Sequence, residues 1–537
     1  MNITDKKYIL ILLAVCLAIF FSHLGVIYVN IMEARNFITA REMLQYDNWL
    51  HTTMNLEPRY EKPPLPTWLT AASASIFGIK NLFGLRLPAA LSVTFLIITT
   101  YFLSKKLFTN TKQAFINALL LATSFYIIFS GRNGQWDIFA HAFMLFAIYK
   151  FYIVFKSKNN LPKDWLWIGL FLGLSFMSKG PVSFFALLLP FLIAYGIVFN
   201  YKNFAKKRLP LFFSILLFLI VGLSWGVYIY LTDNTSAEAI ADKETLAWTN
   251  RNVRPWYYYW SFFTQSGLWT FFSFIALLYP FMIKRVSNKK AYQFTFLWTI
   301  ITLILLSLIP EKKSRYLLPI LIPLALNTGF YIHYLIQKSK QLLKSDMYIA
   351  IFGFGLIGLI CIAFPFIGYF FLKGKLDGFW LSYILTSIAL LSIGIYLFKS
   401  LFIKKFENVF YATILMMCSI LLFGFPLAKA VYDNSNFNNI TNLRTIDIAK
   451  NLPLYSYRGI SPELIWELGE PVIKIDDIEK LPKKDSFGLL ITNDIPIELH
   501  QNYDLQPIDT FDINYINASK RGYKKRLTSK FYLVTKK

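Results

Sequence analysis

The chain has 537 residues, of which 56% are hydrophobic, and its mean hydropathy is +0.47. About 45–50% apolar residues is usual in soluble domains, so this composition excludes an ordinary soluble protein. The net charge of +25 does not indicate nucleic-acid binding, because Lys and Arg stand in short clusters between apolar segments. Cys16, Cys361 and Cys418 lie within apolar segments and predict no disulfide framework.

Thirteen apolar segments are candidate membrane spans, at roughly 20 residues for each crossing. The first covers residues 8–28 and lacks the short core and small-residue cleavage site of a signal peptide. The others are expected near residues 83–104, 113–130, 138–155, 165–178, 182–199, 209–231, 264–283, 291–309, 315–336, 347–371, 377–398 and 408–428. The sequence therefore predicts an all-α polytopic membrane domain.

The charges of the connecting segments support this count. With a cytoplasmic N-terminus, the inner loops carry basic clusters and the outer loops carry the acids, as the positive-inside rule requires. The inner bases are Lys105, Lys106, Lys112, Lys156, Lys158, Lys163, Lys202, Lys206, Lys207, Arg208, Lys284, Arg285, Lys289, Lys290, Lys338, Lys340, Lys344, Lys399, Lys404 and Lys405. The outer acids are Glu33, Glu42, Asp47, Glu57, Glu61, Asp137, Asp233, Glu238, Asp242, Glu244 and Glu311.

An odd number of spans places the end of the chain outside. We expect a membrane domain over residues 1–432 and a small extracytoplasmic α/β domain over 433–537, where short β-rich stretches replace the long apolar runs. The outer loops 30–82 and 232–263 are too long for simple connectors. Loop 30–82 predicts an amphipathic helix over residues 33–46 and then a Pro-rich turn.

Two polar clusters of the outer face offer acid–base chemistry. Loop 30–82 contains Glu33, Arg35 and the run Arg59-Tyr60-Glu61-Lys62, where a carboxylate can take a proton and a cation can hold a phosphate. The alternative is a solvated amphipathic loop. Asp137 closes the run 132–137 and opens the next helix. Its carboxylate can cap that helix, serve in catalysis, or do both.

Two further clusters suggest a bound anion. Residues 311–319 place three bases on the face that the positive-inside rule leaves acidic, and a lipid phosphate would explain this exception. Anchoring by snorkelling side chains is the alternative. Lys179, beside a Gly-Pro pair at a membrane boundary, has the same two interpretations. Residues 251–260 combine two arginines with an aromatic run, which indicates an interfacial belt or a shelf for sugar or phosphate.

Together these clusters resemble the GT-C glycosyltransferases of the protein O-mannosyltransferase type, and most closely the bacterial lipid A aminoarabinose transferases. The resemblance is strong over residues 30–190 and becomes architectural beyond about 325. The matching residues are Glu33-Ala34-Arg35, Ala40-Arg41-Glu42-Met43-Leu44, Asn48-Trp49, Tyr60-Glu61-Lys62-Pro63-Pro64-Leu65, Trp68-Leu69-Thr70, Phe77-Gly78, Leu85-Arg86-Leu87-Pro88-Ala89, Asp137, Ser178-Lys179-Gly180-Pro181, Pro255-Trp256-Tyr257-Tyr258 and Lys313-Ser314-Arg315-Tyr316-Leu317-Leu318-Pro319.

The resemblance implies transfer of a hexose or pentose, with inversion, from a polyprenyl-phosphate donor. The acceptor would be a lipid, such as lipid A, or a protein at the outer face of the bacterial cytoplasmic membrane. By position, Glu33 and Asp137 are the catalytic acids, and Glu61 orients the acceptor or binds a cation. The donor-phosphate candidates are Arg35, Lys62, Lys179, Lys313, Arg315 and Tyr316.

The sequence departs from the family at two positions. The family places an Asp directly before the first-loop Glu, whereas this chain has Met32 there, with Asn30 as the preceding polar residue. Glu33 or Asp137 then takes the base role, or the acceptor is activated differently; a phosphate acceptor needs little base. No His stands near Arg254, where relatives can offer a metal ligand. We expect no required cofactor, and a divalent cation stays an open alternative.

Two rival functions remain open at this point. A transporter or flippase for a lipid-linked sugar should carry charges near mid-membrane or paired halves, and the sequence shows neither. A catalytically degenerate relative would bind the carrier lipid without transfer, which Met32 keeps open. The expected partners are a polyprenyl-phosphate sugar, a lipid or protein acceptor and membrane lipids, with no nucleic acid.

Overall fold

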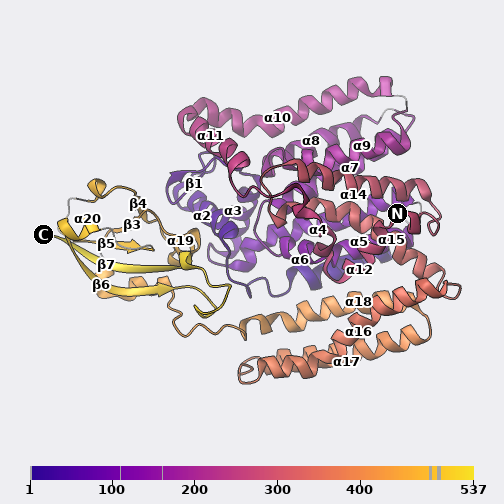
Figure 1. Ribbon diagram of the computed structural model, residues 1–537. Helices are drawn as coiled ribbons and strands as arrows, with labels where there is room; N and C mark the ends of the chain where they lie inside the picture. Colours follow the sequence, from indigo (N-terminus) through magenta and orange to yellow (C-terminus); the bar gives the residue numbers. More distant parts are fainter. Residues whose placement is uncertain are drawn as a thin grey trace.

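The computed structural model describes residues 3–108, 110–159, 161–202, 204–450, 452–482, 486–492 and 497–537. Figure 1 shows a long bundle of helices with a β-sheet at one end. The N-terminus lies at the end of the bundle farthest from the sheet, and the C-terminus lies beyond the sheet. The two ends of the bundle are therefore distinct, and the elements described below divide between them.

The bundle is built from apolar helices that pack around one continuous hydrophobic core. Its helices are α1 (Ile3–Cys16), α4 (Leu82–Phe108), α5 (Thr111–Ala122), α6 (Phe125–Gly131), α7 (Asp137–Lys156), α8 (Pro162–Lys179), α9 (Leu189–Phe199), α10 (Arg208–Thr232), α12 (Thr270–Leu277), α13 (Tyr279–Met282), α14 (Lys289–Leu308), α15 (Leu321–Gln337), α16 (Lys344–Leu372), α17 (Trp380–Phe402) and α18 (Phe406–Ser419). An α-helix forms the hydrogen bonds of its interior backbone groups within its own segment. A membrane span requires this, because the lipid offers no hydrogen-bond partners.

Among the described residues, eight helices are long and apolar enough to cross a membrane. A ninth candidate is the pair α5 and α6, whose axes bend by 68°. Each of the thirteen predicted segments contains helix, but several are short or broken. The segment 264–283, for example, is divided between a 3-10 helix (Phe262–Trp269), α12 and α13. The chain is thus a polytopic helical membrane protein, and the count of thirteen spans stays a prediction.

The first long loop is ordered. It contains α2 (Ile31–Tyr46), a hairpin of β1 (Thr53–Met54) and β2 (Glu57–Pro58), and α3 (Leu65–Phe77). Helix α2 confirms the helix predicted over residues 33–46, and its N-terminus carries a capping box in which Asn30 and Glu33 satisfy each other's backbone amides. The second long loop contains α11 (Asn234–Asn250).

The C-terminal region forms a five-stranded sheet of order β4-β3-β5-β7-β6. β3 pairs parallel with both β4 and β5, while β7 runs antiparallel between β5 and β6. The strands are β3 (Leu454–Tyr457), β4 (Ile473–Ile475), β5 (Ser486–Ile491), β6 (Tyr503–Asp512) and β7 (Thr528–Lys536), with helices α19 (Pro462–Leu468) and α20 (Ile497–Asn502) between them. A small α/β region therefore follows the bundle, as expected; the boundary between residues 432 and 433 stays a prediction.

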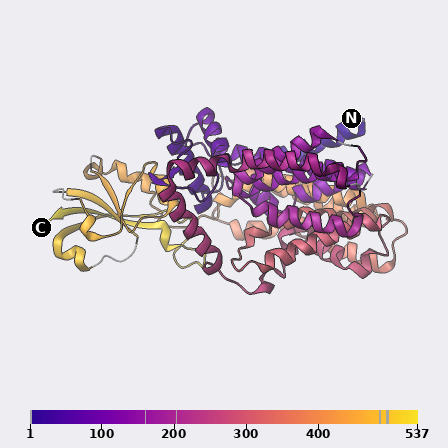
Figure 2. The ribbon, with the colours of Figure 1, turned by 90° about the horizontal axis from the view of Figure 1, so that it is seen from above.

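The sheet region is joined to the first loop. Trp466 of α19 packs edge-on against Phe37 of α2, with ring centroids 5.4 Å apart. The side chain of Asn55 donates to the Val472 carbonyl at 2.6 Å and accepts from the Val472 amide at 2.7 Å. Figure 2 shows from above that the sheet stays at the end of the bundle. Loop 30–82 therefore lies between the bundle and the sheet.

Candidate active site

The centre of the candidate site is a buried ion pair. Asp137 is the first residue of α7 and Lys179 is the last of α8, and the two helices pack together, so both side chains reach the same end of the bundle. The Lys179 ammonium donates to Asp137 Oδ1, and the two side chains are only 8% and 6% exposed. Oδ2 of Asp137 is buried and has no hydrogen-bond partner among the described residues. One oxygen of this carboxylate therefore has an unused acceptor site among the described residues.

The capping alternative for Asp137 is not observed. The N-cap of α7 is Trp136, and no side chain makes a capping hydrogen bond there. Asp137 lies inside the first turn, where its charge still interacts favourably with the helix dipole. Its side chain turns to Lys179 rather than to backbone amides of its own helix.

Three cations gather around the ring of Tyr316, which belongs to a 3-10 helix at Ser314–Ile320. The charged atoms of Lys179, Lys313 and Arg315 each lie 5.6 Å from the ring centroid. Arg315 also acts electrostatically on Asp137, and its buried Nε has no partner in the described part of the chain. The basic segment 311–319, which the sequence predicts to bind an anion, thus lies against the Asp137–Lys179 pair.

Glu311 holds this basic segment in place. Its carboxylate accepts hydrogen bonds from Lys313, from the Tyr316 hydroxyl at 2.9 Å and from Arg251 Nε at 3.3 Å. Burial favours a higher pKa of Glu311, but these bonds and charges outweigh it and lower the pKa. Lys312 instead donates to the backbone carbonyls of residues 254 and 309. Lys313 and Tyr316 are therefore already partnered in this state.

The first loop brings further charges to Trp136, the neighbour of Asp137. The guanidinium of Arg59 stacks on the Trp136 ring at 4.9 Å and donates to the Arg35 carbonyl at 3.4 Å. Burial lowers the pKa of Arg35, the charge of Glu61 opposes this shift, and the charge of Arg315 adds to it. Arg35 Nε and Glu61 Oε2 are buried without a hydrogen-bond partner among the described residues.

Lys62 is placed differently from Arg35. Its ammonium forms an ion pair with Glu244 of α11 at 3.2 Å, and both side chains are 27% exposed. The pair connects the two long loops of this end. Lys62 thus keeps further N–H donors beside the one that faces Glu244.

Glu33 occupies a fully buried position and has no free acceptor site. Its oxygens accept from Arg86 Nε at 2.7 Å and Nη2 at 2.9 Å, from the Gly134 amide at 3.0 Å and from Asn30 Nδ2 at 2.8 Å. The Asn30 backbone amide adds a fifth donor, whereas a carboxylate offers about four lone-pair sites. The predicted catalytic role of Glu33 stays a prediction, and this geometry favours a positioning role.

Sequence reasoning assigned no role to two residues of this region. Arg86, a member of the matched motif, is the buried partner of Glu33. Glu463 of α19 is paired with Arg526 at 2.6 Å, acts electrostatically on Arg35 and keeps Oε2 without a partner in the described residues. A motif search over the start of α4 could single out Arg86, whereas no local signal points to Glu463.

The described residues contain no group of three or more His, Cys, Asp or Glu side chains that could hold a metal ion. The acid nearest to such a role, Glu61, lies 3.9 Å from the Arg59 guanidinium, an unsuitable neighbour for a cation. That the protein requires no cation stays a prediction.

The chain is similar to several known proteins over much of its length. The profile of the family described as dolichyl-phosphate-mannose-protein mannosyltransferase matches residues 61–228. An undecaprenyl phosphate-alpha-4-amino-4-deoxy-L-arabinose arabinosyl transferase of Pseudomonas fluorescens is 27% identical over 58% of this chain and 55% of its own length, so the chain spans about half the length of that relative. An enzyme of the same name from Yersinia enterocolitica is 24% identical over 89% of this chain and 87% of its own length.

The fold matches a solved structure along nearly the whole chain. The structure of ArnT from Cupriavidus metallidurans bound to undecaprenyl phosphate superposes with a TM-score of 0.66, covering 98% of this chain and 97% of that one at 13% identity. Its apo state gives a TM-score of 0.68. The profile, the relatives and the fold agree with the resemblance predicted from the sequence: this membrane protein is similar in sequence and in fold to GT-C glycosyltransferases of the PMT and ArnT type.

Proposed function

We propose that this chain transfers a sugar from a polyprenyl-phosphate-linked donor to an acceptor, and that Asp137 lies at the reaction centre. The observation that carries the proposal is the buried Asp137–Lys179 pair, in which Asp137 Oδ2 has no partner in the described part of the chain. Buried polar groups that only stabilise a fold are normally satisfied. The names of the similar enzymes and the lipid bound to the similar structure support the class of donor.

The proposed transfer breaks the bond between the anomeric carbon of the sugar and the phosphate oxygen of the donor. The phosphate leaves with the bonding electron pair, and the acceptor oxygen forms the new bond from the opposite face, which inverts the anomeric centre. If the acceptor is a hydroxyl, its proton passes to Asp137 Oδ2. A phosphate acceptor is already ionised and needs no base. Lys179 holds Asp137 in position throughout.

The leaving phosphate needs preorganised cations. Arg35 and Arg315 are the best candidates, because each keeps a buried Nε without a partner among the described residues. A guanidinium can bind a phosphate through two parallel hydrogen bonds, which supplies both charge stabilisation and orientation. Glu61, whose Oε2 lies 3.9 Å from the Arg59 guanidinium but has no hydrogen-bond partner among the described residues, is proposed to orient the acceptor.

The remaining donor-phosphate candidates have protein partners. Lys179 is bound to Asp137, Lys62 to Glu244, and Lys313 and Tyr316 to Glu311. Their direct contact with the donor phosphate stays a prediction. For Tyr316 such contact requires that the donor displaces Glu311, because its single hydroxyl donor is used, whereas the ammonium groups of Lys62 and Lys313 keep further N–H donors.

We assign the site to the outer face of the bacterial cytoplasmic membrane, with a cytoplasmic N-terminus, thirteen crossings and an extracytoplasmic C-terminal domain. The sheet lies at one end of the bundle and the N-terminus at the other (Figure 1), which suits this orientation. The acceptor is a lipid such as lipid A, or a protein; the transferred sugar is a hexose or a pentose.

The test is sugar transfer by the full chain in liposomes supplied with a panel of polyprenyl-phosphate sugars and with hydroxyl and phosphate acceptors. With a hydroxyl acceptor, Asp137→Asn should lower the initial rate by roughly 10²- to 10⁴-fold, the usual contribution of a general base. Asp164→Asn is the matched control, because Asp164 also pairs with a lysine, Lys150, at 2.7 Å. It lies in the first turn of α8, at the end of that helix opposite Lys179.

Other outcomes would separate the rivals. Movement of the intact lipid-linked sugar across the liposome membrane without transfer would favour a flippase. Binding of the carrier lipid with no transfer from any donor would favour a degenerate relative. Equal activity of Asp137→Asn and Asp164→Asn on hydroxyl acceptors would contradict the role proposed for Asp137. Thermal unfolding of each variant shows whether a lost rate reflects a lost fold.

A further inference from the structure

A pocket lies at the end of the bundle opposite the candidate active site. It has a volume of about 580 Å³ and is formed by the ends of α4, α7 and α9 and by the start of α14. Helix α7 connects the two places, with Asp137 at one end and Lys156 at the other. Its 20 residues separate them by about 30 Å at a rise of 1.5 Å per residue. This pocket therefore takes no part in the transfer proposed above.

Three lysines line the pocket: Lys106, Lys156 and Lys290. None of them forms an ion pair with a carboxylate in the described residues. Other lysines at this end do find acids: Lys105 pairs with Asp5 at 2.5 Å and Lys150 pairs with Asp164 at 2.7 Å. The pocket thus concentrates positive charge that the protein itself leaves uncompensated.

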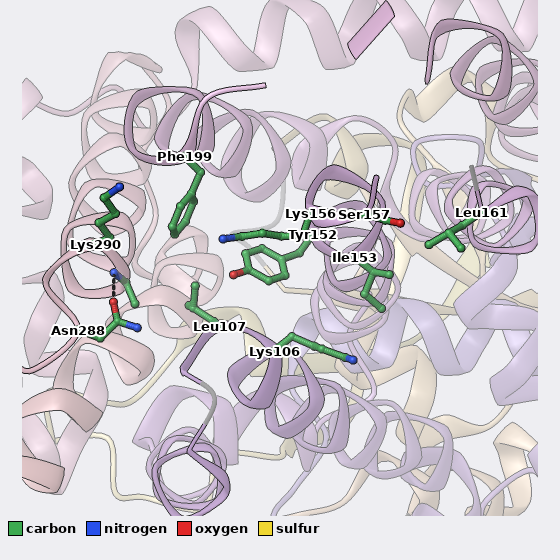
Figure 3. A pocket seen from close by; sticks show the side chains of 11 residues that line it. Lys106, Leu107, Tyr152, Ile153, Lys156, Ser157, Leu161, Phe199, Asn288 and Lys290 are labelled. Atoms are coloured by element: carbon green, nitrogen blue, oxygen red, sulfur yellow. Dashed lines mark hydrogen bonds between the residues drawn. The ribbon is translucent and has the colours of Figure 1, made fainter. Parts of the chain in front are cut away.

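The side chain of Lys156 is exposed, and its ammonium lies against two aromatic rings of the pocket. Its ammonium lies 4.2 Å from the centroid of the Phe199 ring and 5.6 Å from that of Tyr152. Figure 3 shows it between these two rings, directed to the side where Asn288 and Lys290 lie, while Lys106 points the other way. Lys156 and Lys290 repel each other electrostatically. An anion between the two ammonium groups would attract both of them and offset this repulsion.

Two polar features point into the same space. Tyr152 is only 3% exposed, and its hydroxyl, which Figure 3 shows beside the Lys156 ammonium, has no hydrogen-bond partner among the described residues. Helix α14 begins at Lys289, and its Ala291 amide is capped by the Asn288 side chain at 3.1 Å. The first amides of α14 add the positive end of a helix dipole to the wall that carries Lys290.

We propose that this pocket binds the phosphate head group of an anionic membrane lipid. Lys156, Lys290 and the Tyr152 hydroxyl would hold the phosphate, and Leu107, Ile153 and Phe199 would contact the first carbons of the acyl chains. Basic pockets between membrane helices recognise lipid head groups in this way. Snorkelling alone brings a lysine ammonium to water. It does not explain why the Lys156 ammonium lies between two aromatic rings, beside the hydroxyl of the buried residue Tyr152.

The test measures lipid bound to the purified full chain by native mass spectrometry, in micelles containing phosphatidylglycerol or phosphatidylcholine. The double variant Lys156→Ala/Lys290→Ala should bind phosphatidylglycerol roughly 30-fold more weakly than the wild type, from about 1 kcal/mol for each lysine near a lipid surface. Lys156→Arg/Lys290→Arg keeps the charge and should retain binding. Neither Lys156 nor Lys290 forms an ion pair in the described structure, so both double variants should keep the fold.

The matched control is Lys338→Ala/Lys340→Ala, which removes the same charge from exposed residues after α15. Those residues lie at the same end of the bundle, because α14 and α15 are consecutive spans and α15 ends there. Equal weakening in the control would overturn the proposal in favour of general surface attraction. Equal binding of phosphatidylcholine would also overturn it. Inorganic phosphate that displaces the lipid at low millimolar concentration would identify a free anion as the ligand and reject the lipid.

Discussion

Two buried carboxylates at one end of the bundle are arranged in opposite ways. Glu33 accepts five hydrogen bonds from Arg86, Gly134 and Asn30, and its side chain is fully buried. Asp137 accepts from Lys179 alone and keeps one buried oxygen without a partner in the described residues. Both acids lie in motifs that resemble those of glycosyltransferases, so the sequence does not distinguish their roles. Only their surroundings distinguish them.

The difference shows how a site divides structural and chemical work. A saturated carboxylate can hold α2 against α4 and against the segment before α7, but it has no lone pair for a substrate. A carboxylate with one free oxygen is costly to bury unless a ligand or a proton satisfies it. The comparison therefore predicts loss of stability when Glu33 changes and loss of transfer when Asp137 changes.

The largest expected effect is that of replacing Glu33. Glu33→Gln leaves the Arg86 charge buried without its partner, which should lower the free energy of unfolding by about 3–5 kcal/mol. Glu33→Gln/Arg86→Met removes both charges and should recover most of that loss. Thermal and denaturant unfolding in detergent would measure both, with Glu57→Gln as a control at an exposed acid of the same loop. A Glu33→Gln protein of normal stability that has lost transfer would show that Glu33 is the base.

An intermediate effect is expected for the cations. Arg35→Gln and Arg315→Gln should each lower kcat/KM for the polyprenyl-phosphate donor by roughly 10- to 150-fold, the range for a lost hydrogen bond to a charged group. Initial rates at varied donor concentration would measure this, with Arg521→Gln as an exposed control on the sheet region. Unchanged donor kinetics in both variants would remove these arginines from the phosphate site. The reaction would then depend on the cations that are now paired with acids.

The smallest effect is a dependence of stability on pH. The pKa of Glu311 is lowered below its ordinary value of 4.5 in the folded protein, so Glu311 stabilises the fold above that pH. This stabilisation is lost as the pH falls from 4.5 through the lowered pKa. The melting temperature of the wild type should therefore fall more on acidification than that of Glu311→Gln. If the melting temperatures of the two proteins fell equally from about pH 6 to about pH 3.5, this role of Glu311 would be contradicted.

Much of the fold can be predicted because its signals are local. Continuous apolar runs predict the helices of the bundle, and the charges of loop 30–82 predict α2 over 33–46. The short β-rich stretches after residue 433 predict a sheet region. The breaks within apolar segments are harder, because hydropathy does not change there. Gly267 adopts a φ of 65° inside the segment 264–283, and this turn separates two helices that the sequence presents as one span.

The partners of the charged residues cannot be predicted in the same way. Each apolar helix can pack against many other helices and bury a similar area. Which charged side chains form ion pairs depends on which helices become neighbours. Glu33 with Arg86 and Asp137 with Lys179 are brought together by helix packing, not by spacing in the sequence. The same holds for Glu463, whose proximity to Arg35 depends on how α19 docks on α2. A family resemblance can locate the residues but not their hydrogen-bond state.

The double hydrogen bond between Asn55 and Val472 limits how such proteins can be recombined. A chimaera that exchanges only the C-terminal sheet with a relative would leave the amide of Asn55 facing a foreign backbone, and α19 facing a foreign surface on α2. Loop 30–82 and the sheet therefore form one unit of exchange, although most of the bundle separates them in the sequence. Successful domain transplantation in this fold should require both segments from the same parent.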